Sequence, residues 1–268
     1  MLNKFTPQAL TNLKDEVALV TGAGGQLGAE IVNALLQCGA KVVAIDNCSD
    51  AIEKKSIAMD WGSQSVFTLA ADISKRESVS NIFDKSIAHF GKIDHLINNA
   101  GVSVFEHFFE RTEESIDMVM DVNLKGTLFC IQDYLKQKKA MPELRGVIVN
   151  IASHYGLISP DPRIYTDCDR KNSEIYGATK AGIIQMTRYF AVHAAEFGVR
   201  VNAVSPGGVR NPGNPQGEDF QRNYAFRCPL GRMAETWEMI GPVIFLLSPA
   251  ANYVTGQNIV VDGGMTSW

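Results

Sequence analysis

The stretch EVALVTGAGGQLGAEIVNALLQCGAKVVAID constrains the fold of this chain more than any other. Residues 17–20 are a short, continuously apolar run, and after a glycine-rich turn Ile31 and Leu35 follow at helical spacing. Gly39 stands where the end of such a helix needs a glycine, and residues 41–45 form a second apolar run. This order of elements predicts a strand, a helix and a second strand, which together make one β-α-β unit.

The same pattern recurs along the whole chain. Strand patterns appear in SVFTLAADIS, IDHLINNAG, GVIVNIAS, VRVNAVSPGG and NIVVDGG, and helical patterns lie between them. TEESIDMVMDVNLKGTLFCIQDYL predicts one long helix or two, and residues 206–217, rich in proline, glycine and asparagine, predict a loop. Because short strands that are apolar throughout belong to parallel sheets covered on both faces, we expect an α/β fold with a doubly wound sheet of about seven strands. It should form a single domain over residues 15–268, after a polar leader of residues 1–14.

Composition and charge argue against several classes of function. The net charge of -4, with no basic stripe, does not favour a nucleic-acid partner. No apolar run reaches the roughly 18 residues that a membrane-spanning helix needs, and MLNKFTPQALTNLKDEV lacks the apolar core of a signal peptide. The scattered cysteines form no CxxC pair and the histidines have no ligand spacing, so we expect reduced thiols and no metal. A cytoplasmic protein with a small-molecule substrate is the resulting expectation.

The glycine-rich turn TGAGGQLG and Asp46 predict a dinucleotide site. Glycines let the backbone turn tightly and approach a pyrophosphate, which then lies at the positive end of the following helix. Other β-α turns also use glycine, but the strand-turn-helix context favours a cofactor. Asp46 ends the second strand, where a carboxylate accepts the adenosine ribose hydroxyls, and no arginine or lysine follows at once to bind a 2′-phosphate. NAD is therefore favoured over NADP, the alternative being that Asp46 is a turn or helix-capping aspartate.

The segment SHYGLISPDPRIYTDCDRKNSEIYGATK contains three tyrosines, of which one is expected to act in acid-base chemistry. A phenol has a pKa of about 10 and needs a nearby cation to act as a base near neutral pH. Tyr176 and Lys180 are spaced i and i+4 on one face of a predicted helix, whereas Tyr155 and Tyr165 have no cation at that offset. The spacing alone is common in ordinary helices, but here it follows a strand that ends in Ser153. Tyr176 is therefore the candidate for proton transfer at an alcohol or ketone.

These motifs together resemble the short-chain dehydrogenase/reductase family over roughly residues 13–264. TGAGGQLG, AADIS, NNAG, VNLKG, VNIAS, YGATK, VRVNAVSPGGV, PLGRM and YVTGQNIVVDGG occur in the order in which the family has them. The resemblance implies a Rossmann-type seven-stranded sheet, a nicotinamide cofactor, and a homodimer or homotetramer formed through long helices near residues 112–135 and 175–197. The element YGLISPD is also similar to sequences among enzymes of bacterial surface-sugar pathways.

The resemblance also assigns roles to individual residues. Tyr176 is implied as the acid/base, and Ser153 as the donor of a hydrogen bond to the substrate oxygen. Lys180 is implied to bind the nicotinamide ribose and to lower the pKa of the tyrosine, and Asn123 to hold a water leading to that lysine. The cofactor is implied to contact Gly22, Gly24, Gly25, Gln26, Leu27, Gly28, Asp46, Asp72, Ile73, Asn99, Ala100, Gly101, Tyr176, Lys180, Pro206, Gly207 and Val209.

Three positions depart from the family pattern. Gln26 replaces the middle glycine of the turn, which leaves the geometry at the pyrophosphate open. The threonine that the family usually has beyond its proline-glycine pair is absent, and Asn211 is the candidate to replace it. An insertion separates Ser153 from Tyr176.

Two polar segments, residues 154–175 and 207–228, are expected to form the substrate loops. Their composition favours a polyhydroxylated or anionic substrate such as a sugar, sugar phosphate, nucleotide sugar or sugar acid, although a charged insertion is also typical of a solvated surface loop. The candidates for substrate contact are His154, Tyr155, Arg163 and Arg210, and for His154 a structural role is the alternative. A 3-oxoacyl-thioester reductase, whose pocket would need apolar walls, is the second function considered. A non-catalytic NAD-binding regulator is the third, against which the intact catalytic residues argue.

Overall fold

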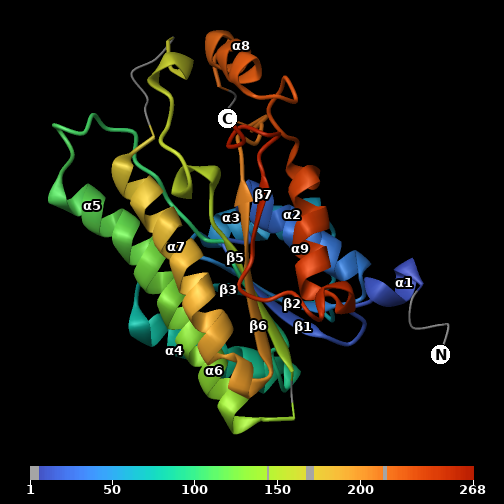
Figure 1. The fold of residues 1–268 in the computed structure, drawn as a ribbon. Helices are drawn as coiled ribbons and strands as arrows, with labels where there is room; N and C mark the ends of the chain where they lie inside the picture. The colour runs from blue at the N-terminus through green and yellow to red at the C-terminus, as the bar shows by residue number, and fades with distance from the viewer. Residues whose placement is uncertain (1–5, 144, 167–171, 214–215) are drawn as a thin grey trace.

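The computed structural model describes residues 6–143, 145–166, 172–213 and 216–268. Figure 1 shows one twisted sheet with helices on both faces, and its seven strands pair in parallel in the order β3-β2-β1-β4-β5-β6-β7. The strands are β1 (Val17–Thr21), β2 (Lys41–Asp46), β3 (Val66–Ala70), β4 (His95–Asn98), β5 (Gly146–Ile151), β6 (Val199–Pro206) and β7 (Asn258–Val261). The expected α/β, doubly wound Rossmann-type fold is confirmed.

The helices divide between the two faces of this sheet (Figure 1). One face carries α4 (Arg76–Phe90), α5 (Glu113–Met120), α6 (Thr127–Ala140) and α7 (Glu174–His193). The other carries α2 (Gln26–Gln37), α3 (Ser49–Ala58) and α9 (Ile240–Leu247). Two further helices, α1 (Pro7–Leu10) and α8 (Glu218–Arg227), lie outside these layers.

Strand β1 illustrates why the strands are apolar without alternation. All five of its residues are buried. Ala18 and Val20 pack into the core shared with α2 and α9, while Val17 and Leu19 pack into the core shared with α4 and α6. Because both faces of a parallel sheet are covered, both sets of side chains must be apolar.

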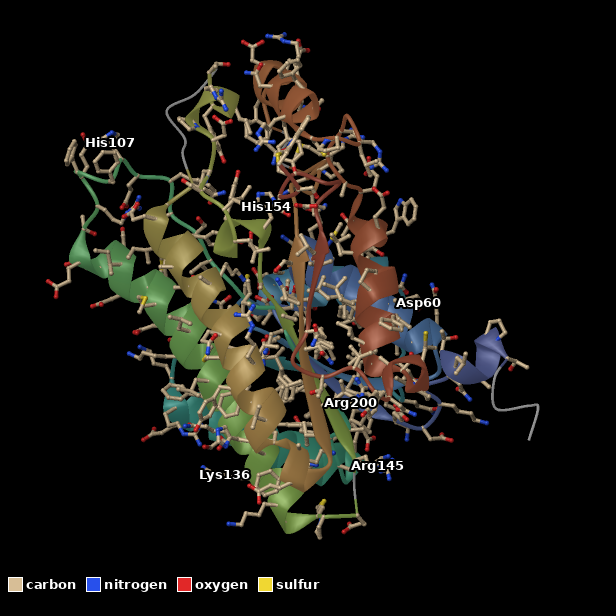
Figure 2. The ribbon with its side chains drawn as sticks, viewed as in Figure 1. Asp60, His107, Lys136, Arg145, His154 and Arg200 are labelled. Atoms are coloured by element: carbon tan, nitrogen blue, oxygen red, sulfur yellow. The ribbon has the colours of Figure 1, made fainter. Side chains whose placement is uncertain are left out.

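The two ends of the sheet differ in what surrounds them. His154 lies near the carboxyl ends of the strands, whereas Arg145 and Arg200 lie at the amino ends of β5 and β6 (Figure 2). Parallel strands bring all their carboxyl ends to one edge, where ligands of open α/β sheets bind. The sequence motifs named above therefore converge on one edge.

Helices α3 and α8 were not expected from the sequence. Helix α3 buries only Ile52, so it carries almost no apolar periodicity. Helix α8 occupies the last part of the second segment, residues 207–228, that was expected to be a substrate loop; it buries Phe220 and Tyr224, spaced i and i+4, while Glu218 and Arg222 are exposed. Its charged composition concealed the short apolar face.

Two other sequence expectations are refined. The long helical pattern that was expected as one helix or two is α5 and α6 joined without a break by a π-helical turn, Asp121–Gly126. Leu13, placed by sequence in the polar leader, is fully buried in the core beside α2, and its backbone N–H donates to the Cys38 carbonyl at 3.1 Å. Gly39 has a φ of +86°, which is the left-handed conformation expected after the end of α2.

Candidate active site

Tyr176 lies in the first turn of α7. Ser173 is the N-cap of this helix, and its Oγ accepts a hydrogen bond from the Tyr176 N–H at 2.9 Å. The phenol ring lines a cavity at the carboxyl edge of the sheet. The cap fixes where the helix begins, and so it fixes the height of Tyr176 above the strands.

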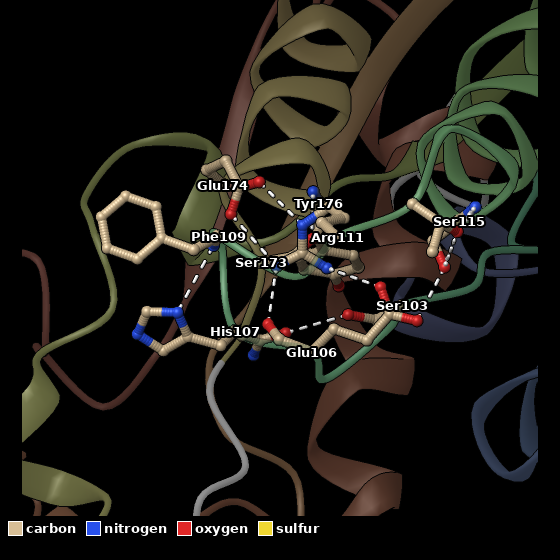
Figure 3. A network of polar contacts seen from close by, with 11 residues as sticks. Ser103, Glu106, His107, Phe109, Arg111, Ser115, Ser173, Glu174 and Tyr176 are labelled. Carbon is tan, nitrogen blue, oxygen red and sulfur yellow. Dashed lines mark hydrogen bonds and ion pairs between the residues drawn. The ribbon is translucent and has the colours of Figure 1, made fainter.

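A polar network from the segment between β4 and α5 holds this helix start in place (Figure 3). The nearly buried Arg111 donates from Nε to Glu174 Oε1 at 2.7 Å and from an Nη to the Glu106 carbonyl at 2.9 Å. Ser103 Oγ donates to Asn172 Oδ1 at 3.1 Å. Asn172 and Glu174, at the end of the insertion, are therefore each held by a hydrogen bond, one on either side of the N-cap Ser173. The insertion's charged residues Asp167, Asp169, Arg170 and Lys171 lie outside the described residues.

Ser153 lies beside Tyr176 despite the insertion between them. It follows β5 and caps the 3-10 turn η3 (His154–Gly156), where its Oγ accepts from the Tyr155 N–H at 3.1 Å. A Cβ added to Gly156 would lie 2.8 Å from the backbone of Lys180, so this glycine permits the turn to pack directly on α7. Ser153 and Tyr176 line the same cavity. Burial raises the pKa of the Tyr176 phenol, and Ser153 partly opposes the rise.

Lys180 is buried one turn further along α7. Its Nζ donates to the Ile151 carbonyl at 2.8 Å and lies 5.6 Å from the centre of the Tyr176 ring. Burial lowers the pKa of this lysine to about 8, so the ammonium form still predominates at neutral pH. A Cβ added to Gly101 would lie 3.3 Å from Nζ, so the glycine of NNAG leaves space for the ammonium group.

Asn123 is fully buried in the π-helical turn between α5 and α6. Its Oδ1 accepts from the Val102 N–H at 2.8 Å, and its Nδ2 donates to the Val102 carbonyl at 3.0 Å and to Thr179 Oγ1 at 3.1 Å. These bonds tie the segment after β4 to α7. The side chain thus organises the site, and its role in holding a water stays a prediction.

A cleft beside the start of α2 gathers most of the predicted cofactor residues. The predicted residues that line it are Gly22, Gly25, Gln26, Leu27, Gly28, Asp46, Asp72, Ile73, Asn99, Ala100 and Gly101. The sequence did not single out Ile45, Asn47, Ala71, Val102 and Val122, which also line it. Each of these five residues is the chain neighbour of a residue that the sequence did single out, and Val122 precedes Asn123.

The glycine turn in this cleft is shaped by close backbone contacts. Gly22 has a φ of +67°, and a Cβ added to Gly28 would lie 2.0 Å from the Gly22 carbonyl oxygen. Asn99 Nδ2 donates to the carbonyls of Thr21 and Gly22 at 3.0 and 3.1 Å, which locks the turn to the end of β4. A side chain at either glycine would close the approach to the start of α2, so the turn suits a pyrophosphate at the helix N-terminus.

Asp46 accepts hydrogen bonds within the turn and also lines the cleft. Its Oδ2 accepts from the Gly24 N–H and its Oδ1 from the Cys48 N–H, both at 3.0 Å. Gly24 is thus used to close the turn rather than to line the cleft. Each carboxylate oxygen has a further lone pair, and Asp46 also lines the cleft, so it can accept ribose hydroxyls as well.

Gln26, the departure from the family glycine, connects two distant parts of the chain. Its Nε2 donates to the Arg210 carbonyl and to Thr236 Oγ1, which lie in the segments after β6 and before α9. The side chain therefore directs its amide towards the substrate loop. The cofactor turn and the segment after β6 are held together by a contact that a glycine could not make.

A second cavity, of about 330 Å³, adjoins Ser153 and Tyr176. Its size is within the range of small-molecule sites. Its other lining residues are Phe105, His154, Tyr155, Tyr165, Asn172, Gly207, Gly208, Val209, Asn211, Gln216, Phe220, Tyr224 and Met233. Among the described residues, those that line it include none with a charged side chain at neutral pH. This lining differs from the strongly polar composition of the two loops, because α8 turns its aromatic face inwards.

The four predicted substrate residues are placed differently by the structure. His154 and Tyr155 line the cavity, and the Tyr155 hydroxyl lies 2.9 Å from the Tyr165 hydroxyl. Arg163 is exposed and pairs with Asp161, and Arg210 pairs with Glu235 at 2.7 Å. Neither guanidinium is among the groups that line the cavity. Pro206 ends β6 directly before Gly207, which lines the cavity together with Val209.

Within the part of the chain that the structure describes, no group of three or more His, Cys, Asp or Glu side chains could hold a metal ion. No helix among the described residues is long and apolar enough to cross a membrane.

Comparison with known proteins gives matches along almost the whole chain. A family model described as enoyl-(acyl carrier protein) reductase matches residues 22–266. An NAD-dependent glycerol dehydrogenase of Listeria innocua is 31% identical, with 95% of each chain covered. A 3-oxoacyl-[acyl-carrier-protein] reductase of Thermotoga maritima is 32% identical over 94% of this chain and 98% of its own. A crystal structure of a short-chain dehydrogenase from Leptospira borgpetersenii with bound NAD+ is 39% identical, covers 94% of this chain and 93% of its own, and superposes with a TM-score of 0.86.

We predict that Gln26→Leu loosens the segment after β6. The change keeps the side-chain volume but removes the two hydrogen bonds to Arg210 and Thr236, so the backbone amides of residues 208–213 should exchange with deuterium about 10-fold faster. Gln37→Leu, at the exposed end of the same helix, is the matched control and should leave that segment unchanged. Equal exchange rates in the three proteins would contradict the prediction.

Proposed function

Because the chain belongs to the short-chain dehydrogenase/reductase family, we propose that it transfers a hydride between NAD(H) and a secondary alcohol or ketone of a polyhydroxylated, sugar-like substrate. The observation that carries the proposal is that Ser153 and Tyr176 line one cavity together with uncharged polar and aromatic groups, with Ser153 placed so that it lowers the pKa of the phenol. The cleft beside α2 suits the dinucleotide, and the cavity suits a small molecule.

The residues divide the chemistry among them. When bound, the nicotinamide accepts or supplies the hydride at the reacting carbon. Tyr176 takes the proton from the alcohol oxygen in oxidation and returns it in reduction, and Ser153 donates a hydrogen bond to that oxygen. Burial raises the pKa of the phenol and Ser153 opposes that rise, so proton acceptance depends on Ser153. The cationic Nζ of Lys180, 5.6 Å from the centre of the ring, is the group that would further favour the phenolate.

Tyr176→Phe tests the assignment directly. Removing the hydroxyl removes the proton acceptor, so turnover should fall by at least the 10²- to 10⁴-fold that general acid-base catalysis contributes, while NAD affinity measured by fluorescence titration stays near that of the unmodified protein. Tyr253→Phe, at a fully exposed position that lines neither the cleft nor the cavity, is the control and should retain full activity. Unaltered turnover in Tyr176→Phe would refute the acid-base role.

Ser153→Ala gives a pH-dependent test. The hydrogen bond from Ser153 lowers the pKa of Tyr176, so its removal raises that pKa further. Oxidation requires the deprotonated phenol, and the rising limb of kcat/KM for alcohol oxidation should therefore shift to higher pH, in addition to a loss of rate. Lys180 is unchanged in this variant. If the rising limb of the kcat/KM profile stays at the same pH, the group that titrates there is not Tyr176.

We further propose that NAD is preferred over NADP. The carboxylate of Asp46 lies in the cleft, can accept two ribose hydroxyls and would repel a 2′-phosphate. NAD is also the cofactor in the names of the glycerol dehydrogenase and the Leptospira structure.

Asp46→Asn should change this preference because it removes the charge while keeping a side-chain oxygen for one of the two backbone N–H donors. NADP affinity should rise and NAD affinity should fall, so that the ratio of the two dissociation constants moves by about 10-fold or more. Titration of both cofactors against both proteins measures this. Tighter binding of NADP than NAD by the unmodified protein would overturn the preference.

The second candidate function is reduction of 3-oxoacyl thioesters. The aromatic and apolar part of the cavity wall, Phe105, Phe220 and Met233, favours it, and so does the resemblance to the Thermotoga reductase. A panel of sugars, sugar acids and acetoacetyl thioesters with both redox states of the cofactor separates the two. Absence of turnover on the whole panel would favour a cofactor-binding regulator.

We also propose that the protein is a homodimer or homotetramer formed through α5, α6 and α7. Met118 on α5 and Tyr189 and Val192 on α7 are exposed in the single chain. Exposed apolar side chains on packed helices are typical of a surface that a second copy covers.

A further inference from the structure

His154 is a buried polar side chain for which the fold provides no partner. It follows Ser153 in the chain, only 3% of its surface is exposed, and it lines the substrate cavity (Figure 2). Neither ring nitrogen forms a hydrogen bond to another described residue. Since the large majority of buried polar atoms in proteins have a partner, these two nitrogens indicate a group that enters the cavity from outside.

The surroundings of His154 keep it neutral. Burial lowers the pKa of the imidazole to about 4, and the opposing effect of Asp262 is smaller. Asp262 itself accepts from the backbone N–H groups of Gly264 and Thr266 at 2.9 and 2.8 Å. A neutral imidazole offers one N–H donor and one acceptor nitrogen.

The neighbouring polar atoms in the cavity have partners of their own. The Tyr155 ring packs edge-on against His154 with centroids 4.1 Å apart, and its hydroxyl is bonded to that of Tyr165. The Tyr224 hydroxyl accepts from the Gly208 N–H at 2.7 Å. The imidazole of His154 is therefore a hydrogen-bonding group without a partner among the described residues, and it directly follows Ser153, the proposed donor to the reacting oxygen.

We propose that His154 binds a second hydroxyl group of the substrate, on the carbon next to the one that is oxidised or reduced, so that the enzyme selects vicinal diols and the corresponding hydroxyketones. This inference rests on the proposed oxidoreductase function and narrows its substrate class. Ser153 and His154 line one cavity of about 330 Å³, so one small substrate molecule can contact both side chains. A hydroxyl both donates and accepts, which matches a neutral imidazole, whereas a carboxylate or phosphate only accepts and an acyl chain does neither.

A comparison of two substrates and two variants tests the proposal. The substrates are cis-cyclohexane-1,2-diol and cyclohexanol, which share the ring and differ in the second hydroxyl. His154→Phe should lower kcat/KM for the diol about 10- to 100-fold and leave that for cyclohexanol within about threefold. His154→Gln, which keeps a donor and an acceptor, should retain most of the activity on the diol. Equal losses on both substrates would make His154 a packing residue and overturn the proposal.

A binding measurement keeps this test separate from that of the proposed function. If the unmodified protein oxidises neither compound, the ¹⁵N signals of the His154 ring, assigned by their absence in His154→Gln, are followed in the full chain with NAD+ present. Shifts on addition of the diol but not of cyclohexanol support the role of His154 even if the redox reaction itself fails. No shift with the diol, or the same shift with both compounds, shows that His154 does not recognise a second hydroxyl.

Discussion

The hydrogen bond from the buried ammonium group of Lys180 to the Ile151 carbonyl is the contact around which the active site is organised. A buried ammonium group without a partner would be strongly destabilising, so this bond fixes the position of α7 against the end of β5. Ser153 follows β5 and Tyr176 lies one turn before Lys180, and the same bond therefore sets the serine beside the phenol.

The two halves of the parallel sheet carry two different binding regions at their carboxyl edge. The ends of β1, β2, β3 and β4 line the cleft that suits a dinucleotide, and the segments after β5 and β6 line the substrate cavity. Gln26 joins the two halves, because its side chain leaves the cofactor turn and binds the segment after β6. Gln26, which replaces the family's middle glycine, thus links the glycine turn to the segment after β6.

The lining of the candidate substrate cavity could not be predicted from the composition of the loops. The sequence of α8 is rich in charge, and it favoured a polar or anionic substrate. In the structure Phe220 and Tyr224 face inwards at i and i+4 while the charged residues of the helix remain at the surface. The same holds for Arg163 and Arg210, which pair with nearby acids outside the cavity. Charge in a loop predicts a solvated surface more reliably than it predicts a ligand.

The sequence alone determined the features that depend on neighbours in the chain. The β-α-β units, the glycine turn and the spacing of Tyr176 and Lys180 follow from local periodicity and from backbone conformations that few residues adopt. Tertiary structure decided the features that join distant segments: the pairing of Ser153 with Tyr176, the anchoring of α7 by Arg111, and the burial of His154 without a partner. These depend on how the elements pack in space, and no spacing along the chain encodes that packing directly.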